Sequence, residues 1–304
     1  YRDLYRDLYR TFYRIVHEAA GPSPSLAPER VVVIGVTLLT DFQRNSDGTY
    51  EAIGFEDAVL IIQDSLIKTV VPRQNFQIGL NDIAVSGKGN YVVASPIIFG
   101  AADSDPEQWL RGRNLLAAGL SGIGSIALPD ALANSSAGRC AVARINAKEF
   151  PGATPVSIGK RAPEDPSMPV FTVPSKKVSE SNTAFFMKMT EYTRSLQEAG
   201  HSNEAILYGL TNGAARRIGR SDLGVIEVGA RGMVVVTEGN PLDDPSVLFD
   251  PHAVVFGDRV LRRAEIEVLR DSSNKGKKQI EATLGLAPPS DGEAEEESSE
   301  EAEE

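Results

Sequence analysis

Apolar residues gather in short β-branched runs in the first third of the chain and again near its end. The runs at 30–41, 56–72 and 81–100 are separated by turn residues, a pattern typical of strands. A second series of short apolar runs, with Gly and Asp-Pro turns between them, fills 224–263. The pattern therefore predicts strands from both ends of the chain, with a different kind of region between them.

The middle of the chain has helical spacing instead. A helix at 106–119 is expected to begin at Pro106, a favoured first-turn residue, and to end at Gly119, a good C-cap. Two more helices are expected at 183–199 and 203–218, the second with Ser202 as its N-cap. Short buried strands are predicted among these helices at 122–129, 139–146 and 168–174.

The first sixteen residues repeat a tetrapeptide with drift (YRDLYRDLYRTFYRIV). On a helix they would form one apolar stripe of Tyr1, Leu4, Tyr5, Leu8, Tyr9, Phe12, Tyr13 and Val16. A helix of this length is marginal alone in water, so the stripe needs a partner surface, on its own domain or on another subunit. We assign the first seven members of the stripe, from Tyr1 to Tyr13, to partner binding. The segments expected here are an amphipathic helix at 1–20 and a Pro- and Ser-rich linker at 21–30.

The net charge of −11 is concentrated at one end, because 291–304 holds nine acidic residues and no basic one. Such a segment cannot bury enough apolar surface to fold, so it is expected to be a disordered tail. The rest of the chain carries little net charge, which disfavours nucleic-acid binding. No apolar run approaches the roughly 18 residues that a bilayer span requires, so no membrane partner is expected either.

The single cysteine, Cys140, cannot form an internal disulfide or a thiolate metal site, so it leaves the compartment open. The sequence begins at Tyr1 rather than Met, which suggests a trimmed or partial chain and slightly favours an exported or periplasmic location.

The sequence contains no complete motif for nucleotide binding, and its histidines and acidic pairs do not form a recognisable metal or catalytic site. The run at 30–36 keeps only Gly35 of a dinucleotide-binding fingerprint, and the Ser86–Asn90 stretch (SGKGN) is explained better by a hairpin turn than by a phosphate loop. The three histidines lack partners at metal-ligand spacing and are expected to be surface or structural residues: His17, His201 and His252. Two acidic pairs are expected to serve turns or helix starts: Asp103 with Asp105, and Asp243 with Asp244.

The region from 204 to 263 resembles the C-terminal signature of the amidohydrolase superfamily. That signature has a helix ending in T-x-N-x-A-x-x-x-G, a Leu-Gly-x-Ile-x-x-Gly turn, a short strand, a Gly-Asn-Pro-Leu-x-Asp turn and a last strand with a Gly turn. The matching positions are Thr211, Asn212, Ala214 and Ala215 to Gly219, then Leu223 to Gly229, Gly239 to Asp243, and Val254 to Gly257.

The N-terminal strands are similar to the strands that open the same family. In its enzymes they continue as Pro-Gly-x-x-Asp-x-His-x-His, which supplies two ligands of a divalent ion. Here Ala94 and Ser95 hold the Pro-Gly positions, and the Asp and two His positions hold Ile98, Gly100 and Ala102. The Ala-Asp of the family's final strands is Gly232-Met233, and the segment at 168–175 has no counterpart of the Asp late in the barrel. The resemblance thus implies the family's frame without its metal ligands.

Length gives an independent argument. A complete (β/α)₈ barrel takes about 250 residues, and 93–221 has room for about half of one. An open parallel sheet of three to five strands would expose two edges and one uncovered face. We therefore expect an α/β protein with a β-sandwich: a truncated (β/α) barrel-like core at 93–221, inserted in a small composite β-sandwich domain of amidohydrolase type at 31–92 and 222–263. A C-terminal extension with the acidic tail follows at 264–304.

The resulting expectation is a catalytically inactive amidohydrolase-like protein that acts as a structural or assembly subunit. It predicts no catalytic residue, no cofactor and no bound metal. The expected partner is another protein chain, either an active amidohydrolase paralogue or a second copy in a homo-oligomer. Two alternatives stay open: an amidohydrolase-type hydrolase whose site is completed by a partner chain or by carboxylates such as Asp103 and Asp105, and a small-molecule binding module.

Overall fold

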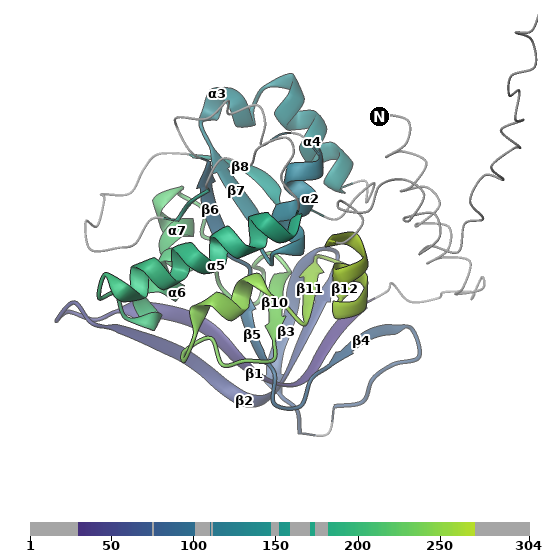
Figure 1. The fold of residues 1–304 in the computed structure, drawn as a ribbon. Helices are drawn as coiled ribbons and strands as arrows, with labels where there is room; N and C mark the ends of the chain where they lie inside the picture. Colours follow the sequence, from purple (N-terminus) through teal and green to yellow (C-terminus); the bar gives the residue numbers. More distant parts are fainter. Residues whose placement is uncertain are drawn as a thin grey trace, which may run out of the picture.

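The structure is a computed structural model, and it describes residues 30–74, 76–100, 110, 112–146, 152–158, 171–173 and 182–270. These residues form a large sheet, a smaller parallel sheet and a set of helices around them (Figure 1). None of the described helices has both the length and the apolar character to cross a bilayer.

The large sheet has eight strands, and it combines the two strand-rich ends of the sequence. Its strands are β1 (Arg30–Arg44), β2 (Tyr50–Gln63), β3 (Leu66–Pro72), β4 (Asp82–Ser86), β5 (Tyr91–Ala94), β10 (Met233–Thr237), β11 (Ala253–Phe256) and β12 (Arg259–Arg262). The order is β12-β11-β10-β5-β1-β2-β3, with β4 paired to β1. The two ends meet where β5 pairs antiparallel with β10, with Val93 opposite Val235.

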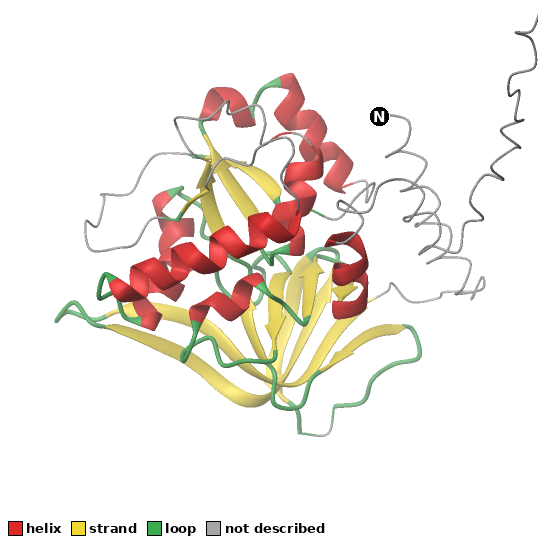
Figure 2. Ribbon diagram, viewed as in Figure 1, coloured by secondary structure: helices red, strands yellow, loops and turns green. Residues whose placement is uncertain are grey.

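All eight strands belong to one hydrogen-bonded sheet rather than to the two separate sheets of a sandwich. Figure 2 shows this sheet strongly bent, with the helices gathered on one side of it. Its inner apolar cluster takes alternate residues from nearly every strand, including Val33, Leu60, Val92, Val234 and Val255, all buried. The bend therefore gives a single sheet the enclosed core that a sandwich would have.

The long strand β1 has two successive partners along one edge. Residues 30–34 pair with β4 and residues 37–39 pair with β5, both in parallel. Gly35, with φ +73°, lies between the two pairings, in a conformation that glycine adopts without strain. The predicted hairpin at 86–90 is wrong, because β4 and β5, which this stretch connects, both run parallel to β1 and therefore in the same direction.

The small sheet consists of four parallel strands in the order β8-β7-β6-β9. They are β6 (Ile97–Gly100), β7 (Ser125–Leu128), β8 (Thr154–Ser157) and β9 (Thr172–Val173). Within the described ranges they do not close into a ring, and their number agrees with the length argument for about half a barrel.

The helices are α2 (Gly112–Leu120), α3 (Asp130–Ala133), α4 (Ser136–Asn146), α5 (Asn182–Glu198), α6 (Asn203–Leu210), α7 (Asn212–Arg217), the 3₁₀ helix η2 (Pro245–Phe249) and a final helix at 263–270. Ser202 accepts a hydrogen bond from the Ala205 N–H, so the predicted cap of α6 is confirmed. The single helix expected at 203–218 is divided by Thr211, whose φ of −119° and ψ of −113° are not helical. The start expected at Pro106 lies outside the described residues.

The strand predicted at 139–146 is wrong, because these residues belong to helix α4. Alanine, the best helix former, supplies three residues of this helix. Ser135 accepts a hydrogen bond from the Gly138 N–H, which satisfies a free donor in the first turn. The apolar run was too short to separate a buried strand from a helix by its pattern alone.

Both faces of the small sheet are covered, so the uncovered face expected from its openness is wrong. On one face Ile97, Phe99, Ala127 and Val156 pack with residues of α7. On the other face Ile98, Ile126 and Leu128 belong to the apolar cluster that also includes residues of α2, α5 and α6 and of the large sheet. This shared cluster joins the two sheets into one body.

Candidate functional site

The candidate site is the carboxyl end of the small parallel sheet, because active sites of α/β folds lie at that end of their strands. Two of the three aligned motif positions are described, the Asp position and the first of the two His ligand positions, and both are on β6. Ile98 is in the middle of this strand, and Gly100 is its last residue. The third position, Ala102, lies outside the described residues.

The Ile98 side chain is fully buried in hydrocarbon. It is 0% exposed, and the same buried cluster includes Ile126, Leu128, Phe171 and Met189. A divalent ion requires oxygen, nitrogen or sulfur donors, and neither Ile98 nor Gly100 has a side-chain lone pair. The hydrolytic metal ion that the resemblance implies therefore does not fit the described residues of this strand.

One polar contact does occur at this end of the sheet. The Ser157 hydroxyl at the end of β8 donates to the Asp130 carboxylate, which begins α3 directly after β7. An acidic residue in the first turn of a helix interacts favourably with its free N–H groups. The contact between Ser157 and Asp130 is therefore explained as a structural one that joins β8 to the start of α3.

The two histidines that the structure describes, His201 and His252, do not form a metal site. His252 Nδ1 lies 2.8 Å from Glu238 Oε1 in an exposed pair, and His201 lies in the turn between α5 and α6. Across the part of the chain that the structure describes, no three His, Cys, Asp or Glu side chains are placed to hold a metal ion together. His17, Asp103 and Asp105 lie outside that part.

The acidic pair at the Gly-Asn-Pro-Leu turn has the structural role expected from the sequence. Asp244 is the N-cap of η2, where its carboxylate accepts from the N–H and the hydroxyl of Ser246. Asp243 accepts a hydrogen bond from the Asn240 amide. The Asn203 amide donates to the carbonyls of Leu242 and Asp243, which fixes this turn to the start of α6.

Two residues of the helix motif that resembles the amidohydrolase signature, Thr211 and Asn212, make structural hydrogen bonds within the protein. The buried Thr211 hydroxyl donates to the Leu207 carbonyl, 2.6 Å away, where α6 ends. Asn212, 2% exposed, donates through Nδ2 to the Asp41 carboxylate and to the Phe42 carbonyl. These bonds connect α7 to β1, so the motif joins the small-sheet region to the large sheet.

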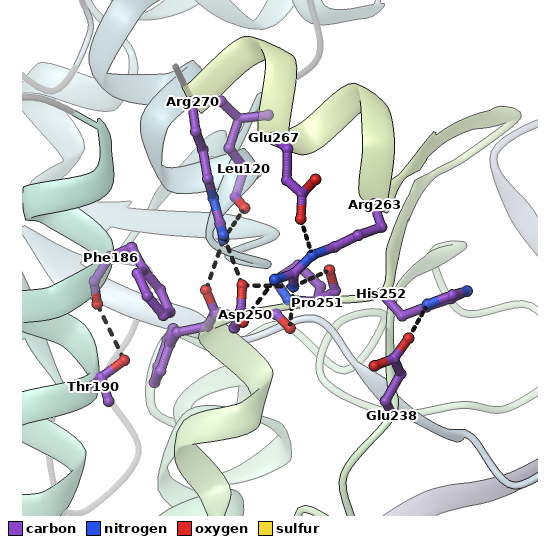
Figure 3. A network of polar contacts seen from close by, with 11 residues as sticks. Leu120, Phe186, Thr190, Glu238, Asp250, Pro251, His252, Arg263, Glu267 and Arg270 are labelled. Atoms are coloured by element: carbon purple, nitrogen blue, oxygen red, sulfur yellow. Dashed lines mark hydrogen bonds and ion pairs between the residues drawn. The ribbon is translucent and has the colours of Figure 1, made fainter. Parts of the chain in front are cut away.

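An arginine network that the sequence analysis missed connects the final helix to the rest of the body (Figure 3). Arg270, 7% exposed, donates to the carbonyls of Leu120 and Phe249 and to the Asp250 carboxylate, at 2.7 to 2.9 Å. Its guanidinium also lies 4.7 Å from the centre of the Phe186 ring. Leu120 ends α2 and Phe249 ends η2, so one side chain satisfies the carbonyl ends of two helices.

The charges of this network are balanced. Burial alone would raise the pKa of Asp250, but hydrogen bonds from Arg263 and Arg270 outweigh burial and lower it. Burial also lowers the pKa of Arg270, against the opposing effect of Asp250. Arg263 donates a further hydrogen bond to Glu267, one turn along the same helix. The network has the character of a structural anchor with paired charges, and a single arginine near the end of a sequence gives no signal from which to predict it.

The predicted partner-binding residues, Tyr1, Leu4, Tyr5, Leu8, Tyr9, Phe12 and Tyr13, lie outside the described residues. Their assignment stays a prediction.

Comparison with solved structures finds the same fold in hydrolases of amidohydrolase type. Molinate hydrolase aligns with 83% of this chain and 98% of its own, at 11% identity and a TM-score of 0.53. A Xaa-Pro dipeptidase with methionine in its active site aligns with 77% of this chain and 100% of its own, at 10% identity and a TM-score of 0.52. An amidohydrolase aligns with 77% and 99%, at 10% identity and a TM-score of 0.52.

A scan against protein-family models finds no match, and a search of curated protein sequences finds none either. The likeness therefore lies in the fold and not in detectable overall sequence similarity. It confirms the resemblance noted in the sequence at the level of the fold: the chain has an amidohydrolase-type fold that is partly shortened.

Proposed function

We propose that this chain is a catalytically inactive, shortened relative of the amidohydrolases that works as a structural or assembly subunit. The observation that carries the proposal is the environment of Ile98. At the position aligned with the Asp of the family's metal-binding motif, directly before the two ligand positions, a fully buried aliphatic side chain is part of a continuous apolar cluster. A charged ion placed there would lose its hydration without gaining ligands, which is strongly unfavourable.

The strand order supports a barrel ancestry for the small sheet. In a closed barrel the last strand pairs with the first, and here β9, the latest of the four strands in sequence, pairs in parallel with β6, the earliest. Strands β7 and β8 follow β6 on its other side, as the second and third strands of a barrel would. We infer that the strands between the third and the last were lost, leaving a barrel-like unit at 93–221 inserted in a composite unit at 31–92 and 222–263.

An assembly role agrees with what the sequence has kept. The large sheet and the contacts that join it to the helices, such as Asn212 with Asp41, do not depend on a metal ion. A body of this kind can persist as a rigid support after its chemistry is lost. We propose that the apolar stripe of residues 1–16 is the surface through which it joins another protein chain.

The test is metal content and hydrolysis, measured on the purified full chain and again on any complex in which it is isolated. Elemental analysis after buffer exchange should find well under one zinc, iron or manganese per chain, and amide and lactam substrates should not turn over above a buffer control. About one tightly held metal ion per chain, together with hydrolysis, would refute the proposal. Hydrolysis that occurs only in a hetero-oligomer would instead support a site completed by the partner.

A further inference from the structure

The far half of the β1–β2 hairpin extends beyond the rest of the large sheet (Figure 1). On one side, residues 50–55 of β2 pair with β1. On the other side, β3 pairs only with residues 58–63, and the Asp57 carbonyl accepts the N–H of Arg73 just after β3 ends. Within the described ranges, residues 50–56 therefore form a strand edge with no strand beside it, here named the open edge.

The open edge has a backbone that is already arranged for pairing. The N–H and C=O groups of an antiparallel strand point alternately to its two sides, so about half of those at 50–56 point away from β1. Tyr50 and Ala52 pack against the cluster that α6 shares with the sheet, while Ile53 is 39% exposed. β1 and the α6 side thus hold the open edge in place, and a row of outward backbone groups is a template for another strand.

Two other edges of the same sheet are blocked. The outer side of β3 is partly used, because Ile67 exchanges backbone hydrogen bonds with residues 229–230, and the strand ends at Pro72. At β4, the Arg262 side chain donates to the Ala84 carbonyl. Pairing, proline and basic side chains are ordinary means of protecting an edge. The open edge has neither a proline nor a basic residue between Tyr50 and Asp57.

Its charges are acidic instead. Glu51, Glu56 and Asp57 are all exposed. If two copies of the chain paired edge to edge in antiparallel about Gly54, Glu51 of each would lie opposite Asp57 of the other, and like charges directly opposite each other are destabilising. The same carboxylates attract lysine and arginine side chains on a neighbouring strand. The charges therefore disfavour a second copy at this edge and favour a basic segment.

We propose that the open edge binds an extended, basic segment of the partner protein by strand addition. In this mode the main-chain hydrogen bonds supply affinity and the side chains supply specificity. The segment would lie beside β2 in the line that β3 leaves at Pro72. This inference rests on the proposed assembly function and gives the chemistry of the partner segment.

The first experiment measures binding of a basic peptide to the full chain. The probe is a fluorescein-labelled heptapeptide of alternating arginine and valine, followed by fluorescence anisotropy. The double variant Glu51→Lys with Glu56→Lys should bind it at least tenfold more weakly than the wild type. Glu191→Lys with Glu198→Lys is the matched control, because it makes the same change of net charge at exposed positions on α5 and should stay within twofold. Circular dichroism shows whether each variant is folded.

A second comparison uses the wild-type chain alone and separates strand addition from attraction between charges. The same heptapeptide with all its internal amide nitrogens methylated keeps every charge but cannot donate backbone hydrogen bonds, so it should bind at least tenfold more weakly. Hydrogen exchange followed by mass spectrometry should show slower exchange of the amides at 50–56 when the unmodified peptide is bound.

Absence of peptide binding would overturn the inference. Equal weakening by the two charge-reversal variants, unchanged binding of the methylated peptide, or protection only outside 50–56 would do so too. These results leave the proposed assembly function in place, because that function is tested by metal content and hydrolysis. A bound metal ion with hydrolysis would instead remove the function itself, whatever the peptide does.

Discussion

Replacing Arg270 with methionine tests whether one buried side chain fixes the final helix to the body. Methionine keeps an unbranched apolar stem against the Phe186 ring but cannot donate a hydrogen bond. The variant loses the donor shared by the Leu120 and Phe249 carbonyls and one of the two arginine partners of Asp250.

The expected loss of unfolding free energy is about 3 kcal/mol. Breaking a buried charge pair by removing one partner costs roughly 3 to 5 kcal/mol. The lower end applies here because the Asp250 side chain is 38% exposed and keeps Arg263. For a protein of this size, about 2 to 4 °C is lost per kcal/mol, so the melting temperature should fall by about 6 to 12 °C.

Arg263→Met is the matched control, since it removes the other guanidinium from the same carboxylate. The Arg263 side chain is 39% exposed, against 9% for Arg270, so the loss should be no more than about 1 kcal/mol. Urea unfolding followed by circular dichroism measures both variants. The reasoning fails if Arg270→Met unfolds within about 0.5 kcal/mol of the wild type, which is the range of ordinary surface substitutions, or if the two variants lose equal stability.

Three further predictions concern single positions. Ile98→Asp should reduce stability by more than about 4 kcal/mol because it buries a carboxyl group among hydrocarbon, whereas Ile98→Val should cost about 1 kcal/mol; equal melting temperatures would contradict the apolar environment of this residue. Hydrogen bonds from Arg220, assisted by Arg231 and opposed by burial, lower the pKa of Asp222 from 3.8 to about 2. Its contribution is therefore present above pH 3.8 and is lost as pH falls toward 2, so Asp222→Asn should flatten that part of a stability profile measured by urea unfolding. Ser202→Ala should lower stability by about 1 kcal/mol through loss of the α6 cap, and an unchanged urea midpoint would show that the cap contributes little.

Much of the fold could be predicted from local patterns in the sequence. β-branched runs predicted the strands around Val32, Val59 and Val235, and capping chemistry identified Ser202 and Asp244. These features depend on residues close together in the chain. The resemblance to the amidohydrolases, confirmed in the fold, linked the two strand-rich ends before any pairing was known.

Features that depend on contacts between residues far apart in the chain could not be predicted from local sequence patterns. The sequence predicted a helix at 183–199, but not that its Met189 would share a cluster with Ile98 and cover the small sheet. The Arg270 network depends on carbonyl groups 150 and 21 residues away, which no motif records. At 139–146 the apolar run was equally compatible with two kinds of element, and the contacts around Ala141 decided in favour of the helix.

The pairing of β5 with β10 has a consequence for biosynthesis. A ribosome releases residues 91–94 long before residues 233–237, so the nascent polypeptide must wait for more than a hundred further residues before that edge acquires its neighbour. During this interval Val92 and Val93 stand on an unsatisfied strand that other emerging chains could join. Premature termination before Met233 would make this vulnerability permanent, so such products should precipitate or be degraded rather than accumulate as folded fragments.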